Sequence, residues 1–411
     1  MLTQPQLGLF AHLTHKANLK NTRYGWLRLT PAYSVHLVSE LLDALPEKYP
    51  VVLDPFCGTG TTALVCAERG IPADTTDINP FLIWLATVKT RQYLSEQIVA
   101  FETASRQVAN AIARSTDVPK WMPQIHQIEK WWDHPTLECL GRAINVIQNP
   151  ERNISSAAID LLKIAFCRTM IERANVSFGH QSMSFKQPVG ELIPLDAEQD
   201  TSAIWQKSVG DISPAAGSLI VREPNILLCD ARRLTAKLEQ NKYACVITSP
   251  PYPNRMSYIR ELRPYMYWLG YLQDAREAGE LDWQAIGGTW GSATSNLTRW
   301  SPIDSRSVPY AKFDDILRDI AKHSPLLARY VHKYFDDMLD HVDELFQVVK
   351  TNGTVHYIVG NSKFYDVMLP VEEIFAALFH SAGFVNVEIK RIRKRTSKKE
   401  LYEFIVSARK P

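Results

Sequence analysis

The chain has 411 residues, of which 45% are hydrophobic and 22% charged, so it can form one large domain with insertions or two domains. Its 46 basic and 44 acidic residues nearly cancel, which excludes overall charge as a source of affinity for a polyanion. The six cysteines lack metal-ligand spacing, and we recognise neither a signal peptide nor an apolar run of ~20 residues. We therefore expect a reduced, metal-free, cytoplasmic protein without a membrane span.

Near the N-terminus, basic and aromatic residues alternate over 11–33, a mixture that suits phosphate contacts and ring stacking as well as it suits a solvated surface arm. Apolar residues then recur at helical spacing over 34–45. This spacing predicts an amphipathic helix laid on a sheet.

A strand predicted over 51–53 ends at Asp54 and leads through a glycine turn into a helix over 63–69. Gly58 and Gly60 lack the Cβ atoms that would keep a ligand away from the backbone, and the first turn of the helix has free N–H groups. We therefore expect a small polar ligand at this turn, and a glycine turn without a ligand is the simpler alternative.

A second predicted strand, over 73–76, ends at Asp77. An acidic residue about 20 positions after a glycine turn is where nucleotide-binding folds hydrogen-bond a ribose diol. Asp77 suits that role, and Ile78 can pack on an adenine face. Because no Walker-type lysine follows the glycines, a nucleoside triphosphate is disfavoured.

Helical periodicity dominates 91–215, and within this region a loop at 174–186 is rich in hydrogen-bonding side chains. It follows Arg168 and Arg173 and is equally suited to reading base edges and to serving as a polar connector.

Two further predicted strands end in polar residues. The strand over 225–229 ends at Asp230, and the strand over 244–247 leads into Thr248-Ser249-Pro250-Pro251-Tyr252. Because each proline fixes φ and lacks an N–H, the pair makes a stiff turn that holds a hydroxyl and an aromatic ring at the carboxyl edge of the sheet. The alternative is an ordinary turn in which Tyr252 only packs.

The C-terminal third contains a loop and a hairpin. The segment 287–300, rich in Gly, Ser and Thr with Trp290 and Trp300, predicts a mobile loop that either grips a nucleic-acid strand or packs on the surface. After a strand over 353–359, segments 384–395 and 401–409 predict a hairpin whose basic tip suits a phosphate backbone or a solvated edge.

The segments Asp54-Pro-Phe-Cys-Gly-Thr-Gly, Asp77-Ile-Asn-Pro and Thr248-Ser-Pro-Pro-Tyr resemble those of S-adenosylmethionine-dependent DNA methyltransferases that modify exocyclic amines, at cytosine N4 or adenine N6. The resemblance implies an α/β fold, a Rossmann-like core with a mostly parallel seven-stranded sheet and a C-terminal antiparallel hairpin, plus a helical insertion. Many cytosine amine methyltransferases carry the glycine turn after the Pro-Pro turn, and this chain departs from that order.

With this core as a guide, we divide the chain into the first part of the core (1–90), a helical insertion that is the candidate target-recognition region (91–215), the part of the core with the TSPPY turn (216–272), a second insertion or loop (273–328) and the C-terminal part of the core (329–411).

The resemblance also implies S-adenosylmethionine as cofactor, with Asp230 at the position that bonds the adenine amine. The cofactor-binding residues that we expect are Thr30, Asp54, Phe56, Cys57, Gly58, Gly60, Thr61, Asp77, Ile78, Asp230, Ala231 and Thr248. The catalytic residues that we expect are Ser249, Pro250, Pro251 and Tyr252, and we expect no metal.

The exocyclic amine of a base is a poor nucleophile because its lone pair is delocalised into the ring. The resemblance implies that the Ser249 hydroxyl and the Pro250 carbonyl accept hydrogen bonds from the amine, while Tyr252 stacks on a base flipped out of the duplex. Methylation of ring carbon five would need a cysteine where Pro251 stands, so covalent catalysis is not supported. Serine before the two prolines resembles the cytosine-specific amine methyltransferases, so the resemblance favours cytosine over adenine.

The sequence therefore predicts a site-specific DNA methyltransferase that acts on double-stranded DNA, with cytosine N4 as the favoured target and a cognate restriction endonuclease as functional partner. Adenine-N6 methylation, methylation of an RNA base amine and a catalytically inactive DNA-binding subunit are the alternatives.

Overall fold

The computed structural model describes residues 18, 22–27, 29, 33–45, 50–114, 121–150, 154–177, 184–185, 197–254, 257–288, 292–302, 307–395 and 400–411. Within these ranges no helix combines the length and the hydrophobicity needed to cross a membrane.

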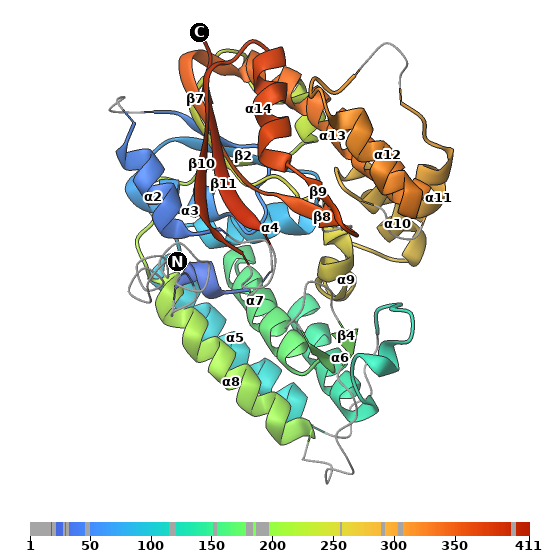
Figure 1. Cartoon of the computed structure of the whole chain (residues 1–411). Helices are drawn as coiled ribbons and strands as arrows, with labels where there is room; N and C mark the ends of the chain where they lie inside the picture. The colour runs from blue at the N-terminus through green and yellow to red at the C-terminus, as the bar shows by residue number, and fades with distance from the viewer. Residues whose placement is uncertain are drawn as a thin grey trace, which may run out of the picture.

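A seven-stranded sheet in the order β10-β11-β7-β6-β1-β2-β5 forms the centre of the molecule (Figure 1). The five strands from β7 to β5 are parallel, and β11 runs antiparallel to both of its neighbours. The predicted α/β fold, with a mostly parallel sheet and a C-terminal antiparallel hairpin, is therefore confirmed. The strands are β1 (Val52–Asp54), β2 (Ala73–Asp77), β5 (Asn225–Leu228), β6 (Tyr243–Thr248), β7 (Val349–Gly360), β10 (Val385–Lys394) and β11 (Tyr402–Arg409).

Helices cover both faces of the sheet, which explains why β1, β2 and β6 are buried along almost their whole length, although β2 is mostly polar. Neighbouring residues of a strand point to opposite faces. Accordingly, Val52 of β1 packs with α2 and α3, whereas Leu53 packs with α13 and α14. These helices are α2 (Val35–Asp43), α3 (Thr61–Arg69), α13 (Pro325–Val348) and α14 (Val371–Ser381).

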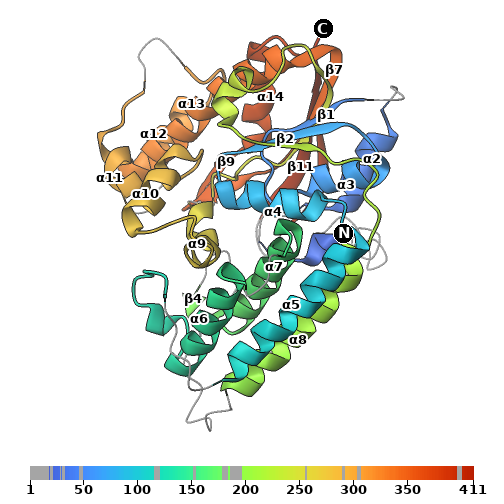
Figure 2. The same cartoon turned by 180° about the vertical axis from the view of Figure 1, so that it is seen from behind.

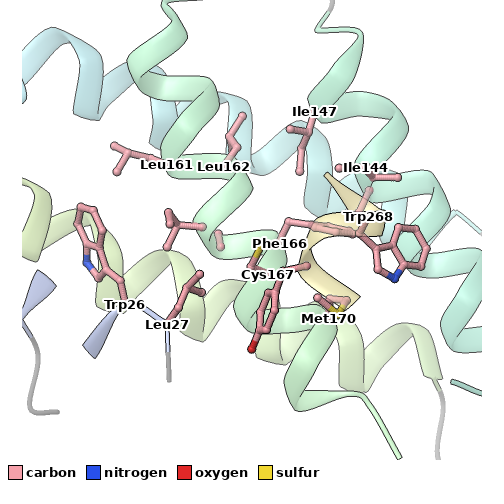
Figure 3. Packing of buried hydrophobic residues seen from close by; sticks show 14 of the residues in the cluster. Trp26, Leu27, Ile144, Ile147, Leu161, Leu162, Phe166, Cys167, Met170 and Trp268 are labelled. Atoms are coloured by element: carbon pink, nitrogen blue, oxygen red, sulfur yellow. The ribbon is translucent and has the colours of Figure 1, made fainter. Parts of the chain in front are cut away.

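Between β2 and β5 the chain forms a helical bundle that Figures 1 and 2 show as a lobe below the sheet. Trp268, from the helix that follows the Pro-Pro turn, is buried in the core of this bundle, with its ring 5.5 Å from that of Phe166 and 5.8 Å from that of Trp132 (Figure 3). The helices of this region are α4 (Pro80–Thr90), α5 (Ser95–Ala113), α6 (His134–Gln148), α7 (Ser156–Glu172), α8 (Ala197–Ala216) and α9 (Tyr258–Trp268).

The described residues between α9 and α13 include three more helices, so the mobile loop predicted over 287–300 is wrong for most of its length. Residues Ser292–Arg299 form α11, because Ala293 and Leu297 lie one helical turn apart and are both buried. Trp290 lies outside the described residues. The other two helices are α10 (Ala275–Gln284) and α12 (Phe313–His323).

The remaining short elements are η3 (Arg23–Gly25), η4 (Ile128–Lys130), η5 (Ala231–Ala236), β3 (Val176–Ser177), β4 (Ser184–Phe185), β8 (Ser362–Phe364) and β9 (Val367–Leu369).

Candidate functional site

The strand order reverses at β1, which has β2 on one side and β6 on the other. Open parallel sheets bind ligands at such a point, outside the carboxyl ends of the strands. The glycine turn, Asp77, Asp230 and the Pro-Pro turn all follow strand ends at this edge. Residues far apart in the sequence are thereby brought to one place.

Asp54 closes the end of β1 and is buried. Its carboxylate accepts hydrogen bonds from the Thr248 hydroxyl (2.6 Å), the Tyr33 hydroxyl (3.0 Å) and the Phe56 N–H (3.2 Å). Burial raises the pKa of Asp54 to about 7, although these hydrogen bonds act in the opposite direction. Asp54 therefore ties β1, β6 and the N-terminal segment together, and no sequence pattern identified Tyr33 as its partner.

The two glycines of the turn have left-handed backbone conformations, with φ of 50° at Gly58 and 75° at Gly60. A Cβ atom on Gly60 would lie 3.1 Å from the Cβ atom of Ala86 in α4. Glycine at position 60 is thus required by the backbone and by helix packing, whereas the sequence suggested that it gives access to a ligand.

Asp77 links the second strand to the glycine turn. Its carboxylate accepts from the N–H groups of Gly58 (3.1 Å) and Asn79 (2.9 Å), and burial raises its pKa to about 6. An ionised carboxylate has about four acceptor positions, so these two bonds leave it able to accept from a ligand.

Lys89 of α4 supports the same turn from inside the protein. Its buried ammonium group donates to the Thr59 carbonyl at 2.7 Å, and burial lowers its pKa to about 8. Sequence reasoning missed this residue because a lysine on an apolar helix carries no signal of its own.

Asp230 is held in an ion pair. Both of its carboxylate oxygens accept from the Arg232 guanidinium, which also donates to Asp337 (2.8 Å) and to the Gln284 carbonyl (2.7 Å). Burial disfavours the ionised form of Asp230, but the bonds from Arg232 outweigh burial and lower its pKa.

The predicted cofactor-binding residues fall into two groups by exposure. Thr30 lies outside the described residues. Those that are partly exposed at this edge are Phe56, Gly58, Asp77, Ile78 and Asp230. Those that are buried are Asp54, Cys57, Gly60, Thr61, Ala231 and Thr248. The exposed group can reach a ligand directly, whereas the buried group shapes the turns that present it.

The Pro-Pro turn is held from three other elements. The Ser249 hydroxyl donates to the Ile358 carbonyl of β7 at 3.0 Å. The Tyr334 hydroxyl of α13 donates to the Pro251 carbonyl at 2.7 Å, and the Tyr252 N–H donates to the Tyr258 hydroxyl at the start of α9 at 2.9 Å. Ser249 and Tyr252 are half-buried, whereas Pro250 is buried.

The Tyr252 side chain is contacted by the C-terminal hairpin. The guanidinium of Arg395 lies 5.1 Å from the centroid of its ring, and its hydroxyl donates to Glu403 at 3.2 Å. The other carboxylate oxygen of Glu403 accepts from Arg393 at 2.7 Å. Burial raises the pKa of Tyr252.

Two of the basic residues predicted to form the phosphate-contacting tip of the hairpin thus have partners near the Pro-Pro turn. Two others, Arg391 and Lys394, lie over the ring of Tyr402. The predicted basic tip also includes Lys390, Lys398 and Lys399. Of these three, Lys398 and Lys399 lie outside the described residues.

Three arginines that the sequence suggested for phosphate or base contacts have internal partners. Arg23 is buried and donates to the carbonyls of Ala215 and Ala216. Arg168 pairs with an acidic residue of α8, and Arg173 donates to Asp200 at 3.4 Å. The surface-arm and phosphate interpretations are therefore both wrong for Arg23. The loop at 174–186 lies largely outside the described residues.

No group of three or more His, Cys, Asp or Glu side chains suited to a metal ion occurs in the part of the chain that the structure describes. The six cysteines are free and buried.

Residues 35–113 match the family described as D12 class N6 adenine-specific DNA methyltransferases. The chain is also similar to the type II methyltransferase M.AvaI of Nostoc sp. (strain PCC 7120 / SAG 25.82 / UTEX 2576), with 22% identity over 399 residues that cover 92% of this chain and 82% of that protein. The type II methyltransferase M.MvaI of Kocuria varians is 21% identical over 408 residues, which cover 90% and 86% of the two chains. These matches support a DNA methyltransferase with S-adenosylmethionine as its cofactor.

Among solved structures, the chain resembles a putative DNA modification methylase from Thermus thermophilus at 16% sequence identity and a TM-score of 0.23. The matched region covers 44% of this chain and 52% of that one.

Proposed function

We propose that this protein transfers a methyl group from S-adenosylmethionine to the exocyclic amine of a base flipped out of double-stranded DNA, with cytosine N4 as the favoured target. In this proposal it is the modification enzyme of a type II restriction-modification system, and its functional partner is a cognate restriction endonuclease. The names of the relatives support this assignment.

The hydrogen bond of Ser249 carries the proposal. The Ser249 hydroxyl donates its proton to the Ile358 carbonyl, and in this arrangement its oxygen lone pairs remain able to accept a hydrogen bond. An acceptor is what an amine needs in order to be drawn towards tetrahedral geometry. The Pro251 carbonyl is engaged by Tyr334, so we assign the second acceptor to the Pro250 carbonyl.

The atoms of the reaction balance without a covalent enzyme intermediate. The amine nitrogen forms a bond to the methyl carbon as the bond between that carbon and sulfur breaks, and the nitrogen then releases a proton to water. The chain has to position the two reactants and accept the amine's hydrogen bonds. Tyr252 supplies a ring on which the flipped base stacks.

The residues at the glycine turn fit the cofactor. Asp77 retains acceptor positions for a ribose diol, and the half-buried Ile78 and Phe56 offer apolar walls for an adenine ring. Asp230 follows β5. There its carboxylate could exchange one of its bonds from Arg232 for a bond from the adenine amine of the cofactor.

Adenine N6 is the second candidate target, because the family matched by residues 35–113 is described as N6 adenine-specific. Serine before the two prolines is the observation that favours cytosine. Both amines would meet the same pair of acceptors, so the choice between them depends on the shape of the pocket.

Transfer of a labelled methyl group from S-adenosylmethionine tests the proposal. We expect incorporation into duplex DNA, recovery of the label as N4-methylcytosine after digestion to nucleosides, and little incorporation into transfer RNA. Recovery as N6-methyladenine would replace the target base. Label in RNA alone, or in neither substrate, would refute the proposed activity.

A further inference from the structure

His341 lies in the C-terminal third of α13, and its side chain is completely buried. One ring nitrogen, Nδ1, is 2.8 Å from the Ala231 carbonyl, and the other, Nε2, is 2.6 Å from the Tyr357 hydroxyl. Both nitrogens of a buried imidazole are therefore used.

These partners define the tautomer of the ring. A carbonyl can only accept, so Nδ1 carries the proton and Nε2 accepts from the Tyr357 hydroxyl. Burial lowers the pKa of His341 to about 4, which keeps the ring neutral near pH 7. The charged groups that face it, Asp230 and Glu344, raise its pKa by less than burial lowers it.

The imidazole also contacts the glycine turn. The Phe56 and His341 rings lie 4.7 Å apart between centroids and are inclined by 67°, an edge-to-face arrangement. A single side chain thus touches Phe56, which follows β1, and Ala231, which follows β5. Both are predicted cofactor-binding residues.

Tyr357 extends this arrangement toward the Pro-Pro turn. It pairs with Thr248 in the parallel register of β6 and β7, and Thr248 donates to Asp54. The next residue of β7, Ile358, accepts the bond from Ser249. The strand that His341 anchors is therefore the one that orients Ser249.

We infer that His341 is a positioning residue of the cofactor pocket, which holds the Phe56 ring and the Ala231 backbone in the arrangement that accepts S-adenosylmethionine. This inference rests on the cofactor site of the proposed function. It assigns to His341 no contact with substrate and no transfer of a proton.

Affinity for S-adenosylmethionine, measured by calorimetry on His341→Asn, tests this role. Asparagine keeps a donor near the position of Nδ1 but removes the ring that contacts Phe56 and the acceptor for Tyr357. We expect at least a tenfold weaker affinity. Tyr357→Phe, which deletes only the hydroxyl, should weaken affinity for S-adenosylmethionine by two- to fivefold. This variant should fold even if His341→Asn fails to fold.

The chain offers a matched control in His356, a neighbouring histidine of β7 whose Nδ1 lies 2.9 Å from the Ser407 hydroxyl. Burial lowers its pKa to about 4 as well. His356→Asn should lower the melting temperature and leave cofactor affinity within twofold of the wild type. The double variant that combines His341→Asn with Phe56→Leu provides a further readout. Its loss of binding free energy for S-adenosylmethionine should be smaller than the sum of the losses in the two single variants.

Wild-type affinity in folded His341→Asn, equal losses in His341→Asn and His356→Asn, or full additivity with Phe56→Leu would each overturn the inference. A wild-type protein that binds cofactor but methylates no nucleic acid would refute the proposed function, while selective loss of binding in His341→Asn would still support the inference. A wild-type protein without affinity for the cofactor would overturn both.

Discussion

The two halves of the candidate site are built differently. On the cofactor side, the carboxylate of Asp77 is bonded by backbone N–H groups of its own turn and of the glycine turn. On the target side, Ser249 and Tyr252 depend on β7 and on Glu403 of the C-terminal hairpin. The two bonds of Asp77 thus come from residues no more than 19 positions away, whereas the bonds of Ser249 and Tyr252 form only once distant strands have paired. Variants should accordingly separate cofactor binding from methyl transfer.

We expect the largest effect from Ser249→Ala, which removes an acceptor that matters most as the amine becomes tetrahedral. Methyl transfer should slow by about 10²- to 10³-fold in single-turnover measurements, the loss seen when one preorganised polar group is deleted from other active sites. Cofactor affinity should be unchanged. Ser407→Ala, which deletes a hydroxyl bonded to His356, is the control and should be fully active. A fully active Ser249→Ala enzyme would refute the proposed amine activation.

Asp77→Ala should have the next largest effect, because it removes the acceptor proposed for the ribose diol. The expected loss of cofactor binding is about 1.5–3 kcal/mol, the usual range for bonds to a charged group, measured by calorimetry. Asp74→Ala is a control on the same strand, where the carboxylate bonds Lys242 (2.7 Å) and Tyr243 (2.6 Å). If both variants lost stability and affinity alike, Asp77 would be only a structural residue.

Tyr252→Ala should weaken capture of the flipped base by ~1–3 kcal/mol, the value of one stacking interaction. Tyr252→Phe should keep most activity, because Glu403 retains its bond from Arg393 when the tyrosine hydroxyl is absent. Fluorescence of a base analogue at the target position reports this step. Equal loss in both variants would show that the hydroxyl bond to Glu403, and not the ring, is what the site needs.

Affinity for S-adenosylmethionine should also depend on pH. The pKa of Asp77 is about 6 in the free protein, and a ribose diol donates to the ionised carboxylate and so lowers that pKa on binding. Affinity should be complete above pH 6 and fall by up to about tenfold per pH unit below it. Asp77→Asn should abolish this slope. A slope that persists in Asp77→Asn would point instead to Asp54, whose pKa is about 7.

The smallest effect that we expect is from Arg395→Met, which removes the cation over the half-buried Tyr252 ring, an interaction worth about 1 kcal/mol. Base capture should weaken severalfold with an unchanged salt dependence of DNA binding. Lys394→Met is the matched control and should lower the salt slope by about one without affecting base capture. The reverse pattern would make Arg395 a phosphate contact.

The contrast between the two halves also explains what the sequence predicted well. The order of strand, acid, glycine turn and helix is local, so the sequence was sufficient to predict the ends of β1 and β2 and the elements around Gly58 and Asp77. The partners of Ser249 and Tyr252 come from β7 and the hairpin, more than 100 residues further along the chain. No periodicity or turn signal in the sequence encodes such contacts.

The residues whose surroundings were predicted wrongly also have partners that are distant in the sequence. A charge on a predicted loop or hairpin was interpreted as exposed, yet Arg23 is buried against carbonyl groups and Arg395 covers an aromatic ring. Lys89 is the single charged residue of an apolar helix, and His341 is one of many polar residues on α13, so neither could be placed in the interior until its partners were known. The segment 292–299 was predicted as a loop from its composition, although two buried side chains make it a helix.

The helix α9 begins beside the Pro-Pro turn, where Tyr258 bonds the Tyr252 N–H, and ends at Trp268 inside the core of the helical bundle. The bundle cannot be exchanged as an independent unit, because Trp268 in its interior belongs to the helix that follows the Pro-Pro turn. In a chimera that replaced 91–215 with the corresponding region of a relative, Trp268 would pack against side chains of a different shape unless α9 were exchanged as well. We therefore expect an exchange of 91–215 to keep the bundle stable only if α9 is exchanged with it.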